Sequence, residues 1–249
     1  MSRALQDRPT RWHRGLSPAG EGVGSLSWSL RRTTIGRRQA EEDTVSGNAD
    51  SGGPVRHRLL WVDGVGGFLL MLADELTIGQ PGGDAPPDIA ILADLSRRHA
   101  RLSRREGSYV LTPYGPCEID GRPIDGPTLV PDDAEICLGS VRLRLRRPHA
   151  LSATALLSIE SGRRTAPAAD AVLLMAECAV IGPGKHSHIC CPHATDEAIL
   201  FRGAEGLRCR AGGPLTVAGR SVEGPVVVVP GERIEGQDFA FCVEEVAEV

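Results

Sequence analysis

The sequence predicts an all-β protein made of two β-sandwich domains in series, after an N-terminal segment without regular structure. Three observations lead to this prediction. Apolar and polar residues alternate in short runs, 30 glycines and 18 prolines are available to separate the runs, and one stretch recurs further along the chain. Period-two alternation bounded by turn residues is typical of half-buried strands. No run after Pro54 has the spacing of an amphipathic helix.

Residues 1–54 show no hydrophobic periodicity. Arginine pairs alternate with the acidic run Glu41–Asp43, and a stretch rich in Ser, Gly, Asn and Asp leads to Pro54. So few apolar residues could not bury enough surface to offset the entropy cost of ordering the segment. We therefore expect a disordered tail that ends in a flexible linker.

Short strand signals begin after Pro54, and residues 55–149 are predicted to form the first sandwich. Glycine-rich and proline-rich loops at 63–67 and 81–87 separate the first runs. Asp120–Gly121 predicts a tight hairpin turn. The longest apolar stretch, 66–73, is interpreted as a buried strand. The strands that we expect are, in chain order, 59–62, 68–72, 76–78, 89–92, 99–105 and 141–146.

An internal repeat predicts the second sandwich. Shifting residues 91–136 forward by 98 positions aligns them without a gap to a later stretch. Ala100 and Leu102 fall on Ala198 and Leu200, and the turn glycines coincide as well. Matching core and turn positions at a fixed offset indicate a duplication. We assign 171–249 to a second domain and 150–170 to a linker. The alternative is one large β-structure in which the two stretches resemble each other by chance.

The first unit contains a recognisable motif. The strand ending in Ile78–Gly79 is followed by Asp88–Ile91, by Leu95-Ser-Arg-Arg-His-Ala-Arg-Leu102, by Ile119–Gly121 and by Ile136–Gly139. This pattern resembles a forkhead-associated (FHA) domain over residues 57–147. The resemblance implies two FHA-like (SMAD/FHA-type) β-sandwiches in tandem, the second degenerate. It also implies recognition of phosphothreonine peptides by loops at one end of the sandwich.

The resemblance assigns seven candidate phosphopeptide-binding residues: Gln80, Ser96, Arg97, Arg98, His99, Asp120 and Gly121. In the family, an Arg after the strand glycine supplies a fork of donors, and this chain has the neutral Gln80 there. The family's Ser supplies a hydroxyl, the next residue touches the peptide, and the His braces the loop. An Asn before the turn glycine holds the peptide backbone, and this chain has Asp120 there.

The second unit departs from the motif at four of these functional positions. Ser96 corresponds to Ala194, His99 to Glu197, Asp120 to Ala218 and Gln80 to Pro183. The resemblance therefore implies a frame without a phosphate site. We interpret the second unit as a packing or protein-interaction domain.

Composition bears on which partners the protein binds and on the compartment in which it is found. The net charge of −4 argues against a nucleic-acid-binding protein, which would show a basic excess. No apolar run is long enough to span a bilayer. Seven cysteines, an odd and irregularly spaced set, favour reduced thiols in the cytoplasm. We expect no cofactor, no nucleic acid and no membrane partner.

Several chemical motifs are considered and set aside. His186, His188, Cys190, Cys191 and His193 are potential metal ligands, but no second ligand pair accompanies them, and no metal site is predicted. Gly182–Lys185 lacks the first glycine and the final Ser or Thr of a phosphate-binding loop. No set of nucleophile, base and acid is recognisable, so no enzyme activity and no catalytic residue are predicted. A hydrolase hidden in the second unit stays open as a third alternative.

The function expected from the sequence is that of an FHA adaptor in bacterial-type signalling, which binds a protein partner through a phosphothreonine segment. Thr44, Thr33 and Thr34 of the tail are candidate phosphothreonines, since some bacterial FHA proteins bind their own phosphorylated tail. The alternative is a phosphate-independent scaffold or dimerisation protein with degenerate FHA folds. The two differ in whether phosphate on the partner is needed for binding.

Overall fold

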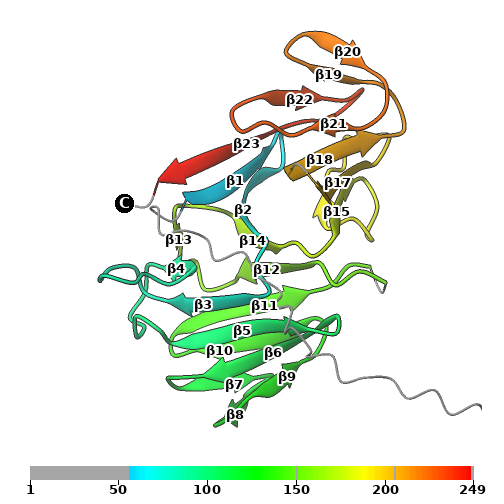
Figure 1. Cartoon of the computed structure of the whole chain (residues 1–249). Coiled ribbons are helices and arrows are strands. Elements are labelled where there is room, and N and C mark those ends of the chain that lie inside the picture. The colour runs from blue at the N-terminus through cyan, green and yellow to red at the C-terminus, as the bar shows by residue number, and fades with distance from the viewer. Residues whose placement is uncertain (1–55, 150, 205, 248–249) are drawn as a thin grey trace, which may run out of the picture. The chain divides into compact units, whose positions relative to one another are not determined.

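A computed structural model describes residues 56–149, 151–204 and 206–247 (Figure 1). These residues form strands, turns and loops, with no helix among them, so the predicted all-β class is confirmed. The described chain offers no helix with the length and apolar character needed to cross a membrane. The predictions for residues 1–54, including Thr33, Thr34 and Thr44, lie outside the described residues.

The largest sheet has twelve strands and runs through the whole described part of the chain. Its strands, in spatial order, are β20 (Arg220–Val222), β19 (Leu215–Val217), β22 (Arg233–Glu235), β23 (Ala240–Ala247), β1 (Arg56–Val62), β2 (Gly66–Met71), β14 (Ala171–Leu174), β12 (Ala155–Ile159), β11 (Val141–Arg146), β10 (Ala134–Leu138), β7 (Cys117–Ile119) and β8 (Arg122–Ile124).

Two smaller sheets complete the fold. The first contains β13 (Thr165–Ala166), β4 (Ile89–Ile91), β3 (Glu75–Gly79), β5 (Ala100–Arg105), β6 (Ser108–Pro113) and β9 (Thr128–Val130), in this order. The second contains β16 (Ile189–Cys190), β15 (Cys178–Gly182), β17 (Ala198–Gly203), β18 (Gly206–Ala211) and β21 (Val226–Val227). Each smaller sheet shares a hydrophobic core with the large sheet, and we call the resulting layers the first and the second sandwich.

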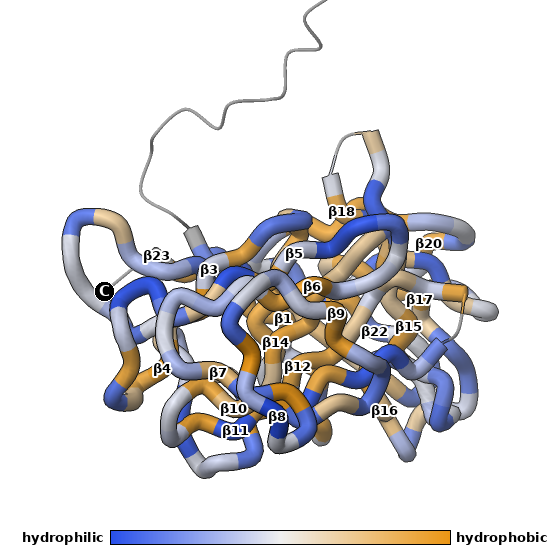
Figure 2. Tube along the Cα trace, turned by 90° about the horizontal axis from the view of Figure 1, so that it is seen from below, coloured by the Kyte–Doolittle hydropathy of each residue, from blue (hydrophilic) through white to orange (hydrophobic). Residues whose placement is uncertain are grey.

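The strands at the middle of the large sheet are buried on both faces. In β14, Val172 and Leu174 belong to the core of the first sandwich, whereas Ala171 and Leu173 belong to the core of the second. Figure 2 shows the apolar character of this region at β1, β12 and β14. Burial on both faces requires nearly continuous apolar runs rather than alternation. The predicted buried strand at 66–73 is β2, one of these central strands.

The strands follow the repeat seen in the sequence. The pairs β5/β17, β6/β18, β7/β19 and β8/β20 each begin 98 residues apart. The half-sheets also have the same order, β8-β7-β10-β11-β12-β14 in one and β20-β19-β22-β23-β1-β2 in the other. They meet at the parallel pair β2 and β14. The two half-sheets are thus related by pseudo-two-fold symmetry, in which β1 and β2 correspond to β12 and β14.

The N-terminal hairpin belongs to the half of the sheet formed by the C-terminal repeat, which the sequence boundaries did not anticipate. Residues 59–72 are predicted within the first domain, but β1 pairs over seven positions with β23, the last strand of the repeat. Leu60, Val62 and Phe68 accordingly lie in the second core. The two sandwiches are thus not simply in series, because the chain exchanges its first hairpin between them.

The segment predicted as a linker, residues 150–170, is largely structured. Its strand β12 pairs with β11 and β14 and fills the place that the exchanged hairpin leaves vacant. Leu157 is fully buried in the first core, which a linker would not allow. The residues on either side of β12 are mostly polar, so this short strand was not predicted from the sequence. Its strand β13 extends the first small sheet beside β4.

Candidate functional site

Two of the loops that carry predicted site residues lie side by side at one end of the first sandwich. The backbone N–H of Gln80 donates to the carbonyl oxygen of Ser96 at 3.2 Å. Gly79 has no room for a Cβ, because the carbonyl oxygens of Ser96 and Arg97 stand against its Cα. Gly79 therefore lets the loop after β3 and the loop before β5 approach closely.

His99 ties these loops to a third one. Its ring is buried, and Nδ1 accepts the backbone N–H of Ser96 at 3.2 Å. Since Nδ1 is an acceptor, Nε2 carries the proton and donates to the carbonyl oxygen of Pro116 at 3.0 Å. The backbone carbonyl of His99 accepts the N–H groups of Tyr114 and Gly115, each at 2.9 Å. His99 therefore connects the loops that contain Ser96, Tyr114 and Pro116 through hydrogen bonds.

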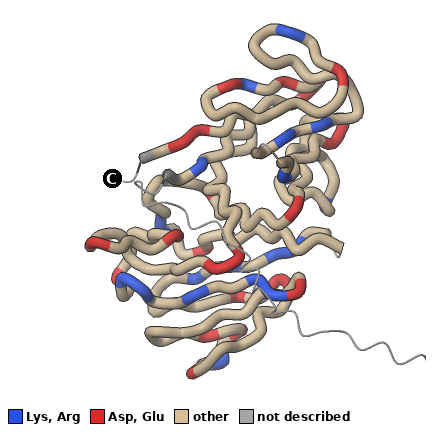
Figure 3. The backbone as a smooth tube through the Cα atoms, viewed as in Figure 1, with Lys and Arg blue, Asp and Glu red and all other residues tan. Residues whose placement is uncertain are grey.

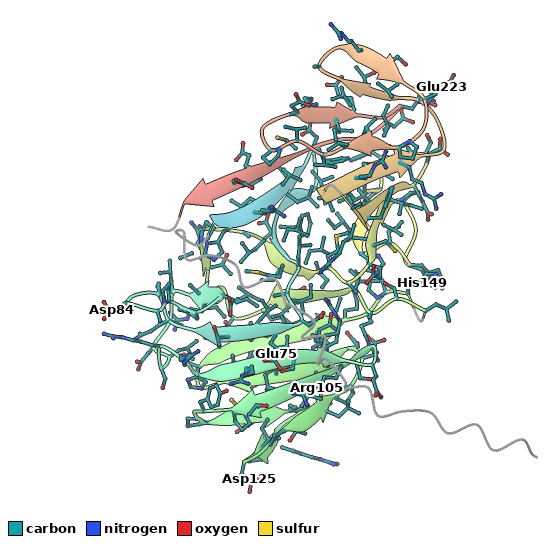
Figure 4. All side chains as sticks on the ribbon, in the orientation of Figure 1. Glu75, Asp84, Arg105, Asp125, His149 and Glu223 are labelled. Carbon is teal, nitrogen blue, oxygen red and sulfur yellow. The ribbon has the colours of Figure 1, made fainter. Side chains whose placement is uncertain are left out.

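The groups left exposed at this end can bind an anion. Ser96, Arg97 and Arg98 are all exposed, and within the described residues no side-chain hydrogen bond or ion pair engages either arginine. The guanidinium of Arg97 lies against the backbone of Gly83 in the loop after β3. Figure 3 shows basic and acidic positions close together on these loops, and Figure 4 shows the exposed Asp84 pointing outwards from them.

Asp120 and Gly121 lie away from this cluster. They form the turn between β7 and β8 with positive φ values of 49° and 72°. The carboxylate of Asp120 accepts the backbone N–H of Glu135 at 2.9 Å. Pro116 precedes β7 and Asp120 follows it, and a strand of three residues is roughly 10 Å long. The structure thus places Asp120 in a structural turn, separated from His99 by the length of β7.

Tyr114, Gly115 and Pro116 are the site residues that sequence reasoning missed. Tyr114 is half exposed, and the guanidinium of Arg101 lies 5.7 Å from the centre of its ring. Gly115 approaches the His99 ring so closely that a side chain would not fit. The repeat alignment contained a signal for this loop, since Gly115–Pro116 recurs as Gly213–Pro214. That signal was interpreted as a turn alone.

The equivalent end of the second sandwich has the opposite character. Thr195, Asp196 and Glu197 replace Arg97, Arg98 and His99, and all three are exposed. Thr195 donates its hydroxyl to Asp238 at 2.6 Å. A cavity of about 290 Å³ lies among Thr195, Asp196 and Asp238. Asp196 in place of Arg98, with Asp238 and Glu197 nearby, would repel a phosphate.

The histidine and cysteine cluster of the second sandwich does not converge. His186 contacts the Pro148 carbonyl, whereas the buried His188 accepts the N–H of Val180 at Nδ1 and contacts the Ser152 hydroxyl at Nε2. Among the described residues no three His, Cys, Asp or Glu side chains are grouped to hold a metal ion. Burial, with His149 and Arg146 nearby, lowers the pKa of His188 to about 4.

All seven cysteines lie in the described residues, and none forms a disulfide. Burial raises the pKa of Cys117 to about 11 and that of Cys209 to about 12. Because the thiolate is the nucleophile, these two buried thiols are unreactive at neutral pH.

Comparisons with known proteins give no family. No family model matches the chain, and neither a curated protein nor a solved structure matches it.

Proposed function

We propose that the first sandwich is an FHA-type module that binds a phosphothreonine segment of a protein partner at the loops 79–88, 92–99 and 114–116. The observation that carries the proposal is the connection through His99. This one buried ring joins the Ser96 loop to Pro116, while Ser96 and Arg97 stay exposed beside it. Loops fixed in this way hold their donors in place before a ligand arrives, which lowers the entropy cost of binding.

The proposed roles follow from the chemistry of a phosphate group. A phosphothreonine carries nearly two negative charges and three acceptor oxygens. The Ser96 hydroxyl supplies a donor, and Arg97 and Arg98 supply charge. Gln80 supplies an amide where the family has a guanidinium, so Arg97, which lies across the loop at Gly83, takes over as the principal cation.

We further propose that the second sandwich acts as a scaffold within a cytoplasmic adaptor without catalytic activity. Its loop end carries Thr195 and Asp196 where the phosphate site of the first sandwich has Arg97 and Arg98. Its large contribution to the shared sheet supports a structural role. Phosphorylated Thr44, Thr33 and Thr34 remain candidate ligands of the first sandwich.

Calorimetric titration tests the proposed site. Peptides of residues 38–50 with Thr44 phosphorylated, and of residues 27–40 with Thr33 or Thr34 phosphorylated, are titrated into the full chain beside unphosphorylated copies. A degenerate phosphothreonine peptide library supplies a ligand that is independent of the tail. We expect binding that requires phosphate and falls about tenfold or more in Ser96→Ala and Arg97→Ala, since each removes a charge-assisted hydrogen bond.

Thr195→Ala, at the position equivalent to Arg97 in the second sandwich, is the matched control and should leave binding unchanged. Equal heats from phosphorylated and unphosphorylated peptides, in the tail series and the library alike, would exclude phosphothreonine recognition.

A phosphate-independent scaffold is the second candidate, and the neutral Gln80 favours it. Asp84 and Asp94, both exposed on the same loops, add negative charge there. The variant Gln80→Arg separates the two candidates. Phosphopeptide binding that appears only in Gln80→Arg would mean that the natural chain recognises its partner without phosphate.

A further inference from the structure

Two cavities adjoin each other beside the proposed site. One, of about 560 Å³, is lined by residues of β7, β8, β10 and β11 together with Ser161 and Arg163. The other, of about 380 Å³, is lined by Trp61 and by both arms of the segment between β12 and β14. Arg163 lines both cavities, so the two adjoin at this residue. We call the two adjoining cavities together the arginine groove.

The groove contains cationic groups without partners. Arg142 and Arg163 line it, as does Arg164, and none of them has a side-chain hydrogen bond or ion pair within the described residues. Arg144, a neighbour on the same sheet, is by contrast paired with Glu160 at 2.6 Å. Unpaired guanidinium groups in a concave site can form bidentate bonds with a carboxylate.

The other polar groups of the groove fit an anionic ligand as well. The hydroxyl oxygen of Ser161 is buried without a hydrogen-bond partner, and Ser140 is exposed beside it. The acidic residues that line the groove are Glu118 and Asp170, and Asp170 already accepts the Gly67 N–H at 2.8 Å. Three guanidinium groups therefore face two carboxylates, one of which is engaged by the backbone.

The backbone at Arg164 is held in place by the fold. The carbonyl oxygen of Arg164 accepts the Leu92 N–H at 2.8 Å, and β13 follows immediately and pairs with β4. Trp61 closes one side of the groove, where its ring covers Gly67 and its indole N–H donates to Glu244 at 2.9 Å. A groove with a fixed wall loses little freedom of its own backbone when a ligand binds.

The groove begins where the proposed phosphothreonine site ends. Pro116 lines the larger cavity, and its carbonyl is the one that His99 binds. Gly139 lines the same cavity and lies close to the His99 ring. A peptide chain that leaves the Ser96 loop over Pro116 therefore enters the arginine groove directly.

We propose that the arginine groove binds acidic side chains of the same partner segment, so that the ligand is a phosphothreonine flanked by Asp or Glu residues. This inference rests on the proposed function and specifies its ligand. The corresponding connection in the second sandwich, Asp63–Val65 between β1 and β2, is too short to carry such arginines. The groove is thus a feature of the first sandwich alone.

The test uses four peptides of equal length and the full chain. One has phosphothreonine with three Glu on either side, the second has phosphothreonine with Ala flanks, and the other two are their unphosphorylated copies. We expect the acidic flanks to raise affinity about tenfold at low salt. Arg163→Ala combined with Arg164→Ala should remove that gain while binding of the Ala-flanked phosphopeptide stays unchanged.

Arg220→Ala is the matched control, since Arg220 is exposed on β20 of the other sandwich and carries the same charge. Thermal unfolding checks that every variant is folded. Fluorescence of Trp61, in a chain with Trp12→Phe and Trp28→Phe, should change with the acidic peptides and not with the Ala-flanked ones.

The outcomes separate the two proposals. Equal affinity for acidic and Ala-flanked phosphopeptides would overturn the groove and leave the phosphothreonine site standing. Binding of the unphosphorylated acidic peptide that is lost in the double variant would support the groove and overturn phosphothreonine recognition. No binding of any peptide would overturn both. Tighter binding of a ten-nucleotide single strand, lost in the same variant, would make the groove a nucleic-acid site instead.

Discussion

The two loop ends of this protein share one framework and differ in chemistry. In the first, Ser96, Arg97 and Arg98 stand exposed beside a buried His99. In the second, the same backbone positions carry Ala194, a Thr, an Asp and an exposed Glu197. Strand lengths, strand order and the turns are nearly unchanged between the two. The fold therefore depends on core and turn positions, and the binding chemistry depends on a few loop residues that can be lost separately.

The comparison also extends to how the repeats are joined. Arg104 and Arg202 occupy equivalent positions, and both donate to backbone carbonyls at the ends of the central strands β2 and β14. Arg104 donates to Leu174 and pairs with Asp74, whereas Arg202 donates to Met175 and Leu72. These bonds hold each small sheet to the ends of the central strands. The two repeats thus retain the arginine that binds the central strands, whereas the residues of the candidate phosphate site differ between them.

The largest expected effect concerns the shared sheet. Leu173→Ala and Leu174→Ala remove neighbouring side chains of β14 that face the second and the first core, respectively. Each should lower the free energy of unfolding by about 2–5 kcal/mol, since both leave a cavity. Because the two cores share this strand, each variant should still unfold in one transition in urea. Two separate transitions, with only one shifted in each variant, would mean that the sandwiches are energetically independent.

The second-largest expected effect is a loss of phosphopeptide affinity that differs between the two loop ends. His99→Ala removes the ring that joins Ser96 to Pro116, so the backbone groups that it satisfied lose their partner. Phosphopeptide affinity should fall about thirtyfold, equivalent to roughly 2 kcal/mol. Glu197→Ala, at the equivalent position, should change it less than twofold. Calorimetry measures both, and equal losses in the two variants would contradict the assignment of the site to the first sandwich.

A pH dependence of stability is expected from His188 in the second sandwich. His188 is neutral in the folded state, with a pKa lowered to about 4, and the unfolded chain binds this proton near pH 6.5. The unfolded state therefore gains stability as pH falls from 6.5 towards 4, and the protein loses on the order of 3 kcal/mol. His188→Gln should make the unfolding free energy less dependent on pH in that window. An unchanged pH profile in this variant would argue against a buried neutral imidazole.

The smallest effect concerns the equivalent turns at Asp120 and Ala218. Both have a φ of 49°, but Asp120 bonds Glu135 and Ala218 has no side chain that could do so. Ala218→Gly should stabilise the protein by about 0.5–1 kcal/mol, because glycine adopts positive φ without strain. Asp120→Gly should not stabilise it, since the bond to Glu135 is lost. Thermal unfolding of the two variants, beside the parent chain, measures the difference.

The sequence predicted the strands better than their partners. Alternation located β5 and β11, and the repeat located their counterparts β17 and β23. The exchange of the first hairpin was not predictable, because an apolar run such as Gly66–Met71 indicates burial without indicating which core buries it. Strand β12 was missed because its five residues lie between polar flanks. Pairing over long sequence distances leaves no local pattern.

The candidate site was predicted in part for a related reason. The motif around Ser96 and His99 is local and was found directly. Asp120 was assigned to the site from its place before a glycine, whereas its positive φ and its bond to Glu135 give it a role in the turn. Tyr114 and Pro116 approach His99 only through the fold. Arg163 and Arg164 lie in a segment that was interpreted as a linker.

The pairing of β1 with β23 has a consequence for biosynthesis. Arg56 and Ala247, which face each other in the sheet, are nearly two hundred residues apart in the chain. During translation β1 leaves the ribosome long before β23 exists, so the edge that pairs with β23 stays unpaired until that strand is made. Contacts of such long range slow folding and leave exposed strand edges open to wrong partners. A nascent chain of this protein would therefore gain from a chaperone that covers the first hairpin until the last strand emerges.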